Sequence, residues 1–177
     1  LRIEDTDQKR LVKDSINNIV EVLKWSGVDF DEGPHINGGT RGPYIQSKRL
    51  DIYKQYMLEL INKKHAYVCF YSQERISKMN NSSIAKQSEA EYDKRFKDIS
   101  SDESISRMDN ENCVVRLAMP KKGNLLIDDL IKGKLKFDYH LIDDPIIIKS
   151  DGFPTYHFAN VVDDYSMQIS HVIRGEE

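Results

Sequence analysis

The last quarter of the chain, residues 149–177, concentrates aromatic, amide and charged side chains. Gly152 and Pro154 mark a turn in this stretch, and Tyr156 and Asn160 follow the turn. If the segment is helical, a spacing of four residues places Tyr156 and Asn160 on the same face. A hydroxyl and an amide presented together can bind a small polar substrate. A core tyrosine and an amide at the end of a helix would show the same spacing, so the pattern alone leaves both interpretations open.

An arginine close to the C-terminus is the second candidate for chemistry. Arg174 follows an apolar run, residues 169–173, which we predict to be a buried strand. Because a guanidinium does not lose its proton, Arg174 needs an anion. That anion can be Glu4 or Glu177, in a structural ion pair, or a substrate carboxylate held by two parallel hydrogen bonds. Ligands of open α/β sheets bind at the C-terminal ends of strands, so this position favours a site.

A third group is the acidic cluster near the N-terminus. Glu4, Asp5 and Asp7 come directly after Leu1–Ile3, which we predict to be the end of a parallel strand. A carboxylate at that end of a strand can hold the ammonium group of a ligand or order a basic nucleic-acid terminus. The alternative is that these acids cap the helix that follows.

These groups need a fold that brings the two ends of the chain together. We predict an α/β fold in which residues 1–65 and 146–177 form a parallel sheet with helices, interrupted by an α+β module inserted at 66–145. Residues 77–112 are polar, and helices or a flexible hairpin both fit them. Ser47 is the expected N-cap of the second helix. The predicted elements are helices at 12–25 and 48–63 and strands at 1–3, 66–71, 113–119, 125–129, 134–139, 146–148 and 169–173.

The composition is that of a globular domain with room for a sizeable insertion. The 177 residues include 26 Lys and Arg against 29 Asp and Glu, a mild negative balance that gives no overall sign of a nucleic-acid partner. The middle of the chain is basic, because residues 61–97 hold eight Lys or Arg against four Asp or Glu. That excess suits contact with phosphates, although a solvated surface is the simpler explanation.

Several classes of protein are disfavoured by what the sequence lacks. No apolar run approaches the roughly 20 residues that a membrane-spanning helix needs. Cys69 and Cys113 show no disulfide pattern, and reduced thiols fit an intracellular, soluble protein. Asp163 and Asp164 are adjacent and therefore point to different sides, so we expect them to be structural rather than metal ligands.

Three strings of the sequence together resemble bacterial-type glutamyl-tRNA synthetases, a family of class I aminoacyl-tRNA synthetases. The strings are L-R-I-E-D-T-D at 1–7, S-D-G-F-P-T-Y-H-F-A-N-V-V-D-D at 150–164 and H-V-I-R-G-E-E at 171–177. The resemblance runs through nearly the whole chain and is weakest at 77–112. It implies part of a Rossmann-like catalytic domain, with residues 66–145 as the inserted module that binds the tRNA acceptor. The implied reaction is ATP-dependent ligation of L-glutamate to the 3′ end of tRNA(Glu) through a glutamyl-adenylate.

The resemblance also implies roles for individual residues. In the family, the glutamate of the I-E-D-T-D string contacts the amino group of the substrate, which corresponds to Glu4 here. The tyrosine and asparagine of Y-H-x-A-N line the glutamate pocket, which corresponds to Tyr156 and Asn160. The arginine of V-I-R-G-E-E contacts bound glutamate and the last glutamate lies by the ATP, which implies these roles for Arg174 and Glu177.

Partners follow from the same resemblance. They are tRNA(Glu), with tRNA(Gln) left open, L-glutamate, and ATP with Mg²⁺ as its counter-ion. The inserted module would meet the acceptor stem through phosphates and shape, and Asp7, Arg10 and Lys149 are weaker candidates for tRNA contact. We expect a monomer and no membrane partner.

Two features of the family are missing from this sequence. Some relatives bind zinc in the inserted module through a C-x-C pair, but the matching residues here are Cys69, Phe70 and Tyr71. One cysteine cannot make a tetrahedral zinc site, so we expect no zinc and no other metal site. The H-I-G-H-like and K-M-S-K-S-like motifs of class I synthetases are also absent. We therefore assign no catalytic residue and expect these 177 residues to be inactive alone.

Other interpretations stay open at this point. Glutaminyl-tRNA synthetases share the fold, although their strings around the acidic motif and the pocket differ more from this chain. A paralogue that glutamylates queuosine in tRNA keeps the same catalytic core. A non-catalytic RNA-binding protein can retain the fold after losing the chemistry. The compartment is expected to be the mitochondrial matrix or a bacterial cytoplasm.

Overall fold

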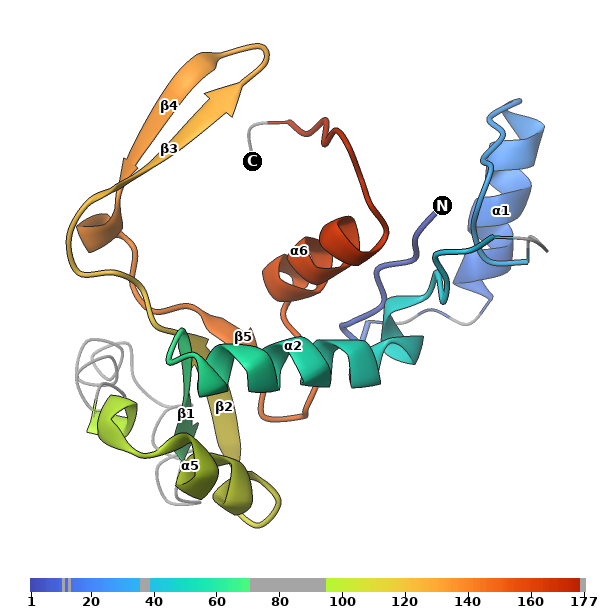
Figure 1. The fold of residues 1–177 in the computed structure, drawn as a ribbon. Coiled ribbons are helices and arrows are strands. Elements are labelled where there is room, and N and C mark those ends of the chain that lie inside the picture. Colours follow the sequence, from blue (N-terminus) through green and yellow to red (C-terminus); the bar gives the residue numbers. More distant parts are fainter. Residues whose placement is uncertain (11, 13, 36–38, 71–94, 176–177) are drawn as a thin grey trace. The chain divides into compact units, whose positions relative to one another are not determined.

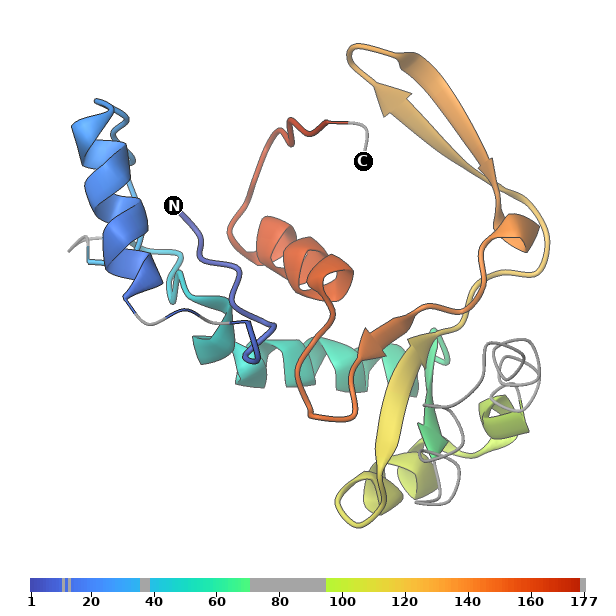
Figure 2. The same ribbon diagram turned by 180° about the vertical axis from the view of Figure 1, so that it is seen from behind.

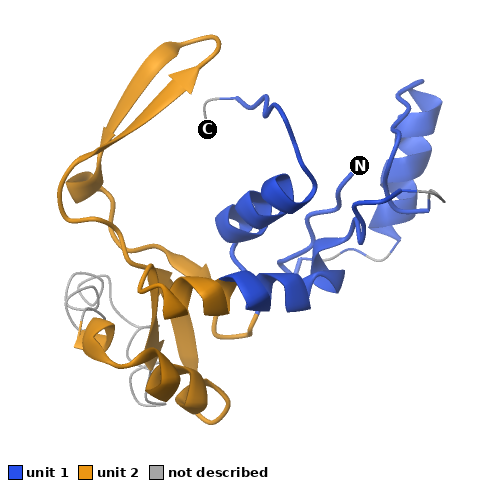
Figure 3. Cartoon of the chain, viewed as in Figure 1, with its two compact units in different colours: residues 1–56, 153–177 blue, residues 57–152 orange. Residues whose placement is uncertain are grey.

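The computed structural model of the chain describes residues 1–10, 12, 14–35, 39–70 and 95–175. Two compact units make up the chain: unit 1 comprises residues 1–56 and 153–177, and unit 2 comprises residues 57–152 (Figure 3). Helix α2, Leu50–Asn62, contributes its first part to unit 1 and the rest to unit 2.

Unit 1 is built from helices and irregular segments that come from both ends of the chain. Ile3 pairs with Ile45 in a single parallel β-bridge. In this bridge the backbone N of Gln46 donates to the Ile3 carbonyl O at 3.0 Å. This is the one parallel pairing in the part of the chain that the structure describes. The helical elements of unit 1 are α1, Ser15–Trp25, the 3₁₀ helix η1, Gln46–Lys48, the start of α2, and α6, Tyr156–Ser166 (Figure 1).

Helix α6 buries polar and apolar side chains together. Gly152, at φ 81°, supports the turn that precedes it, and Thr155 at its N-cap is extended. The helix stops at Met167, after which Gln168 takes a left-handed φ of 58°. The buried residues of the helix recur at helical spacing and comprise Phe158, Ala159, Asn160, Val162 and Asp163.

Unit 2 contains an antiparallel sheet of three strands in the order β1-β2-β5. All five residues of strand β1 are buried, and Val68 of β1 lies opposite Val115 of β2. A separate hairpin, β3 with β4, is seen from both sides in Figures 1 and 2. The elements of unit 2 are β1 Ala66–Phe70, η2 Arg95–Asp98, α5 Ser101–Met108, β2 Cys113–Leu117, β3 Asn124–Asp129, β4 Gly133–Asp138, η3 Tyr139–Leu141 and β5 Ile146–Ile148.

Most of the predicted elements are confirmed with small shifts of their ends. Helices occur at 15–25 and 50–62, and strands occur at 66–70, 113–117, 124–129, 133–138 and 146–148. The polar stretch 77–112 is helical at 95–98 and 101–108, while residues 71–94 lie outside the described part.

Three local predictions are corrected by the structure. Residues 169–173 form no strand: they are exposed and irregular, because the left-handed Gln168 redirects the chain and no described strand pairs with them. The predicted strand at 1–3 is reduced to the Ile3 bridge. Ser47 is not an N-cap but lies inside η1, where its amide N donates to Asp5 Oδ1 at 2.7 Å. Among the described residues, no helix is long and apolar enough to cross a bilayer.

Candidate functional site

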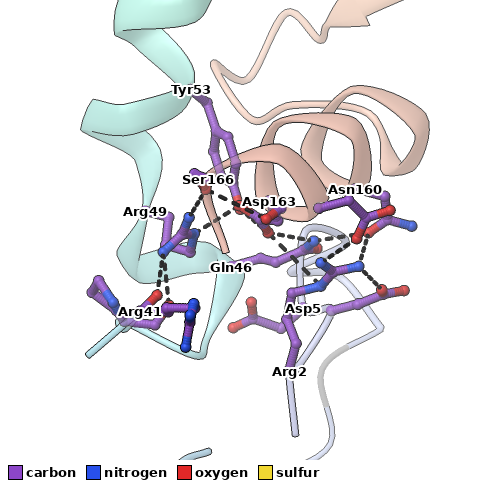
Figure 4. A network of polar contacts seen from close by, with 12 residues as sticks. Arg2, Asp5, Arg41, Gln46, Arg49, Tyr53, Asn160, Asp163 and Ser166 are labelled. Atoms are coloured by element: carbon purple, nitrogen blue, oxygen red, sulfur yellow. Dashed lines mark hydrogen bonds and ion pairs between the residues drawn. The ribbon is translucent and has the colours of Figure 1, made fainter. Parts of the chain in front are cut away.

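A buried carboxylate connects α2 to α6 inside unit 1 (Figure 4). The Asp163 side chain is 0% exposed, and it accepts hydrogen bonds from Arg49 Nε at 2.7 Å and Tyr53 Oη at 2.8 Å. A third bond comes from Gln46 Nε2 at 3.0 Å. A buried charge is tolerated only when it is paired and hydrogen-bonded, and both conditions hold here. Burial and the bond to Asp163 raise the pKa of Tyr53, so its phenol stays protonated and continues to donate.

Both terminal nitrogens of the Arg49 guanidinium, Nη1 and Nη2, also donate hydrogen bonds. Its Nη2 donates to Ser166 Oγ at 2.7 Å, and its Nη1 donates to the Pro43 carbonyl O at 3.0 Å. Because every direction of this buried ion pair is used by protein groups, the pair is structural. It ties α6 to the start of α2, in agreement with the structural role predicted for Asp163.

Arg2 links this interior to the acidic N-terminal segment. Its Nη1 donates to Asp164 Oδ1 at 2.7 Å, and its Nη2 donates to Glu4 Oε1 at 3.1 Å and to Asn160 Oδ1 at 3.2 Å. Burial disfavours the charge, but the hydrogen bonds to Asp164 and Glu4 outweigh this and raise the pKa of Arg2. The side chain is 15% exposed. Arg2 therefore connects two of the predicted site residues, Glu4 and Asn160.

Arg2 and Gln46 were not predicted from the sequence as site residues. Arg2 lies between two apolar residues. An arginine in such a position needs an anion, as was inferred for Arg174, so the same reasoning applies to Arg2. Gln46 carries no comparable signal, because its partners Asn160 and Asp163 lie more than a hundred positions later in the chain.

Some buried polar atoms of this region have no hydrogen-bond partner: Arg2 Nε, Gln46 Oε1 and Asn160 Nδ2. Buried polar atoms are normally paired, so such a concentration of unsatisfied atoms needs an explanation. Asn160 is only 2% exposed, yet its amide donor is unused. An unused donor at this position fits a site that a ligand completes.

A cavity of about 780 Å³ opens beside Arg2 in unit 1. Its volume lies in the usual range for small-molecule sites. It is lined by Arg2, Glu4 and Asp164, by loop residues including Glu32 and Arg41, and by the C-terminal segment that includes Arg174. The wall thus carries cations and carboxylates together, as a site for a charged, zwitterionic ligand would.

Of the four predicted glutamate-binding residues, Glu4 and Arg174 line this cavity, whereas Tyr156 and Asn160 are not among its lining residues and contact residues that are. Glu4 and Asn160 both contact Arg2. The Arg174 guanidinium lies 5.5 Å from the centre of the Tyr156 ring, within the range of a cation–π contact. Arg174 is exposed on an irregular segment instead of ending a buried strand. Glu177, predicted to contact ATP, lies outside the described residues.

Two of the predicted tRNA-contact residues, Asp7 and Arg10, line a second cavity of unit 1 together with Arg2 and Glu4. The exposed side chains of Asp7 and Arg10 pair with each other, with Arg10 Nε 2.6 Å from Asp7 Oδ2. Lys149 belongs to unit 2, where its Nζ lies 3.2 Å from Asp151 Oδ2.

No group of three His, Cys, Asp or Glu side chains in the described ranges is arranged to hold a metal ion. Cys69 is fully buried and packs in the unit 2 core with Tyr67 and Val114. Burial also raises the pKa of the Cys113 thiol, which disfavours the thiolate that a metal would need.

Comparison with known proteins gives a consistent result. The family described as tRNA synthetases class I (E and Q), catalytic domain, matches residues 1–177. The chain is 47% identical to the glutamate–tRNA ligase of Cellvibrio japonicus and 48% identical to that of Protochlamydia amoebophila, covering 100% of this chain and 35% of each relative. A crystal structure of the glutamate tRNA ligase of Elizabethkingia meningosepticum with its amino acid superposes with a TM-score of 0.81 at 35% identity, covering 99% of this chain and 36% of that one. The chain spans about a third of the length of these relatives. It belongs to the catalytic-domain family of the class I tRNA synthetases for glutamate and glutamine.

Proposed function

We propose that the intact protein ligates L-glutamate to the 3′ end of tRNA(Glu), using ATP and passing through a glutamyl-adenylate. The observation that carries this proposal is the charged wall of the unit 1 cavity, which Arg2, Glu4 and Arg174 line. Asn160, whose amide donor is unused, bonds to Arg2 of this wall. The α-carboxylate of glutamate attacks the α-phosphate of ATP and releases pyrophosphate. The glutamyl group then passes to the 2′-hydroxyl of the terminal adenosine.

The charges of this wall match those of glutamate. An amino acid with two carboxylates and one ammonium group needs two sets of donors and one carboxylate. Glu4 supplies the carboxylate for the ammonium group. Arg174 and Asn160 supply donors for carboxylate oxygens, and an arginine can bind a carboxylate through two parallel bonds. We assign Tyr156 to the same site, because its ring lies 5.5 Å from the Arg174 guanidinium, and its hydroxyl would be a further donor for glutamate.

These residues position glutamate and balance its charge. Holding the α-carboxylate in a reactive geometry lowers the activation barrier. ATP arrives with Mg²⁺, which neutralises its phosphate charge. We assign Glu177 to the nucleotide.

We propose that residues 66–145 bind the acceptor stem of the tRNA. The basic balance of residues 61–97 supports this assignment, because contacts to phosphates dominate the affinity for RNA helices. Arg10 and Lys149 would add phosphate contacts, and Asp7 would orient Arg10 through their ion pair. We propose that the protein acts as a monomer, in a bacterial cytoplasm or the mitochondrial matrix.

A charging assay on the full-length gene product tests this function. Radiolabelled glutamate and ATP are supplied with tRNA(Glu) or tRNA(Gln), and a parallel reaction contains labelled glutamine. Glutamate bound through an alkali-labile ester at the 3′ end of tRNA(Glu) is the expected product. Glutamine at the 3′ end would indicate a glutaminyl-tRNA synthetase, and label on an internal base would indicate the queuosine-modifying activity. Binding of tRNA without any charging would support the non-catalytic alternative.

A further inference from the structure

The side-chain amide of Gln46 bonds to two residues of α6 and is fully buried. Its Nε2 donates to Asn160 Oδ1 at 3.0 Å and to Asp163 Oδ2 at 3.0 Å. An amide nitrogen has two hydrogens, so both are used. Neither Gln46 nor Asn160 is among the residues that line the 780 Å³ cavity, whereas Arg2, which donates to Asn160 Oδ1, does line it. Any effect on a ligand there must pass through another residue.

The orientation of the Gln46 amide is fixed by Asp163. The Asp163 carboxylate is held by Arg49 and Tyr53 and offers only acceptors. If the Gln46 amide turned over, its Oε1 would face two acceptor oxygens in the interior, where such repulsion is strong. Only the orientation with Nε2 toward Asp163 and Asn160 avoids this conflict.

The orientation of Asn160 is fixed in turn. Its Oδ1 accepts from Gln46 Nε2 at 3.0 Å and from Arg2 Nη2 at 3.2 Å, which uses both lone pairs. A turned amide would place its NH₂ group against two donors. Asn160 Nδ2 is consequently kept away from the network, buried and without a partner. Asn160 presents a donor and no acceptor to anything that binds beside it.

We propose that Gln46 is a positioning residue that fixes the orientation of the Asn160 amide, so that its donor is kept free for a carboxylate oxygen of the amino-acid substrate. This inference rests on the proposed function of the site. Gln46 Oε1 is buried without a partner, and such an atom reduces stability. Because the unpaired Oε1 lowers stability, the presence of Gln46 at this position fits a role in positioning better than a role in stability alone.

A double-mutant cycle in the full-length protein tests the proposal. Gln46→Met removes both donors and keeps the side-chain length. If this variant does not fold, Gln46→Ser replaces it, because the smaller side chain leaves room for a water molecule that can supply the lost donors. Each Gln46 variant, Asn160→Ala and the corresponding double variant are assayed for charging. Loss of a well-placed donor to a charged group predicts that either Gln46 substitution raises the glutamate KM roughly 10- to 100-fold, with little change in the ATP KM. The same substitution should add less than about twofold in the Asn160→Ala background, because the two residues act as a unit.

Ser166→Ala is the matched control. It removes a hydrogen bond from the far side of the same network, the bond from Arg49 Nη2 at 2.7 Å, and does not touch Asn160. It should lower the thermal midpoint and leave the glutamate KM within about twofold of wild type, because it leaves the orientation of Asn160 intact. Additive effects of Gln46 and Asn160 substitutions, or a glutamate KM for the Gln46 variant no higher than for Ser166→Ala, would overturn the role of Gln46. A wild-type protein that charges no tRNA would instead overturn the proposed function.

Discussion

The two units of the chain have interiors of opposite character. Of the seven polar or charged side chains that are buried among the described residues, only Ser104 lies in unit 2. The other six lie in unit 1 and include a charged pair, Arg49 with Asp163. The core of unit 2 consists instead of apolar residues of β1 and β2, such as Val68 and Val115, which are both 0% exposed.

The polar interior of unit 1 supports the role in binding that we propose for this unit. A buried ion pair contributes little net stability compared with apolar packing, so an interior of this kind is weak as a stabilising core. It can, however, fix the direction of every donor and acceptor at its border. In unit 1 that border is the cavity wall formed by Arg2 and Glu4. In unit 2 a part-buried carboxylate, Asp144, accepts a hydrogen bond at Oδ2 from Tyr67 Oη at 2.7 Å, and Tyr67 belongs to the edge strand β1.

The largest effect is expected when the ion pair of unit 1 is broken. Asp163→Ala leaves Arg49 charged and buried without its partner, and we expect a loss of about 3–5 kcal/mol in the free energy of unfolding. Urea unfolding followed by circular dichroism measures it. The double variant Arg49→Met with Asp163→Leu should recover much of the loss, because it removes both charges. No recovery would mean that the pair contributes more than charge balance.

The next largest effect in kcal/mol is expected for Arg174→Ala, and it concerns the binding of glutamate and not the free energy of unfolding. Losing a charged donor to a substrate carboxylate should cost about 1.5–3 kcal/mol, seen as a higher glutamate KM in the charging assay. Stability should change little, because Arg174 is exposed. Lys24→Ala, which removes an exposed cation from α1, is the control and should leave the KM unchanged. An unchanged KM for Arg174→Ala would remove this residue from the site.

The apolar core of unit 2 should respond in the opposite way. Val68→Ala removes two methyl groups from a fully buried position, and we expect it to lower the free energy of unfolding by about 1–3 kcal/mol. The glutamate KM should stay at the wild-type value when assayed well below the unfolding midpoint. A raised KM would show that the two units do not divide stability and binding in this way.

The smallest effect, none at all, is expected from zinc removal. Cys69 is a core residue of unit 2, so treatment with a strong chelator should leave the unfolding midpoint unchanged. Elemental analysis of the purified protein should find no stoichiometric zinc. One zinc per chain would contradict the argument from Cys69.

The two units also differ in how well the sequence predicted them. The strands of unit 2 follow from short apolar and alternating runs, which depend on neighbours in sequence and are therefore visible locally. The spacing of Tyr156 and Asn160 places them on one face only if the segment is helical, and α6 fulfils this condition. Residues 169–173 show the limit of this reasoning, because an apolar run becomes a strand only where a partner strand pairs with it.

The polar interior of unit 1 could not be predicted in this way. Gln46, Arg49 and Asp163 resemble ordinary surface residues in the sequence, and their burial depends on partners from the opposite end of the chain. The roles expected for Glu4 and Arg174 came from resemblance to a family, and these roles stay predictions.

Calorimetric titration of L-glutamate into the full-length protein tests the central claim most directly, that the polar interior of unit 1 serves amino-acid binding. The account predicts one binding site in the wild type, affinity weakened at least tenfold by Arg2→Met or Asn160→Ala, and affinity unchanged by Val68→Ala at a temperature where all variants are folded. Equal affinity of the wild type and the Asn160→Ala protein for glutamate would contradict it.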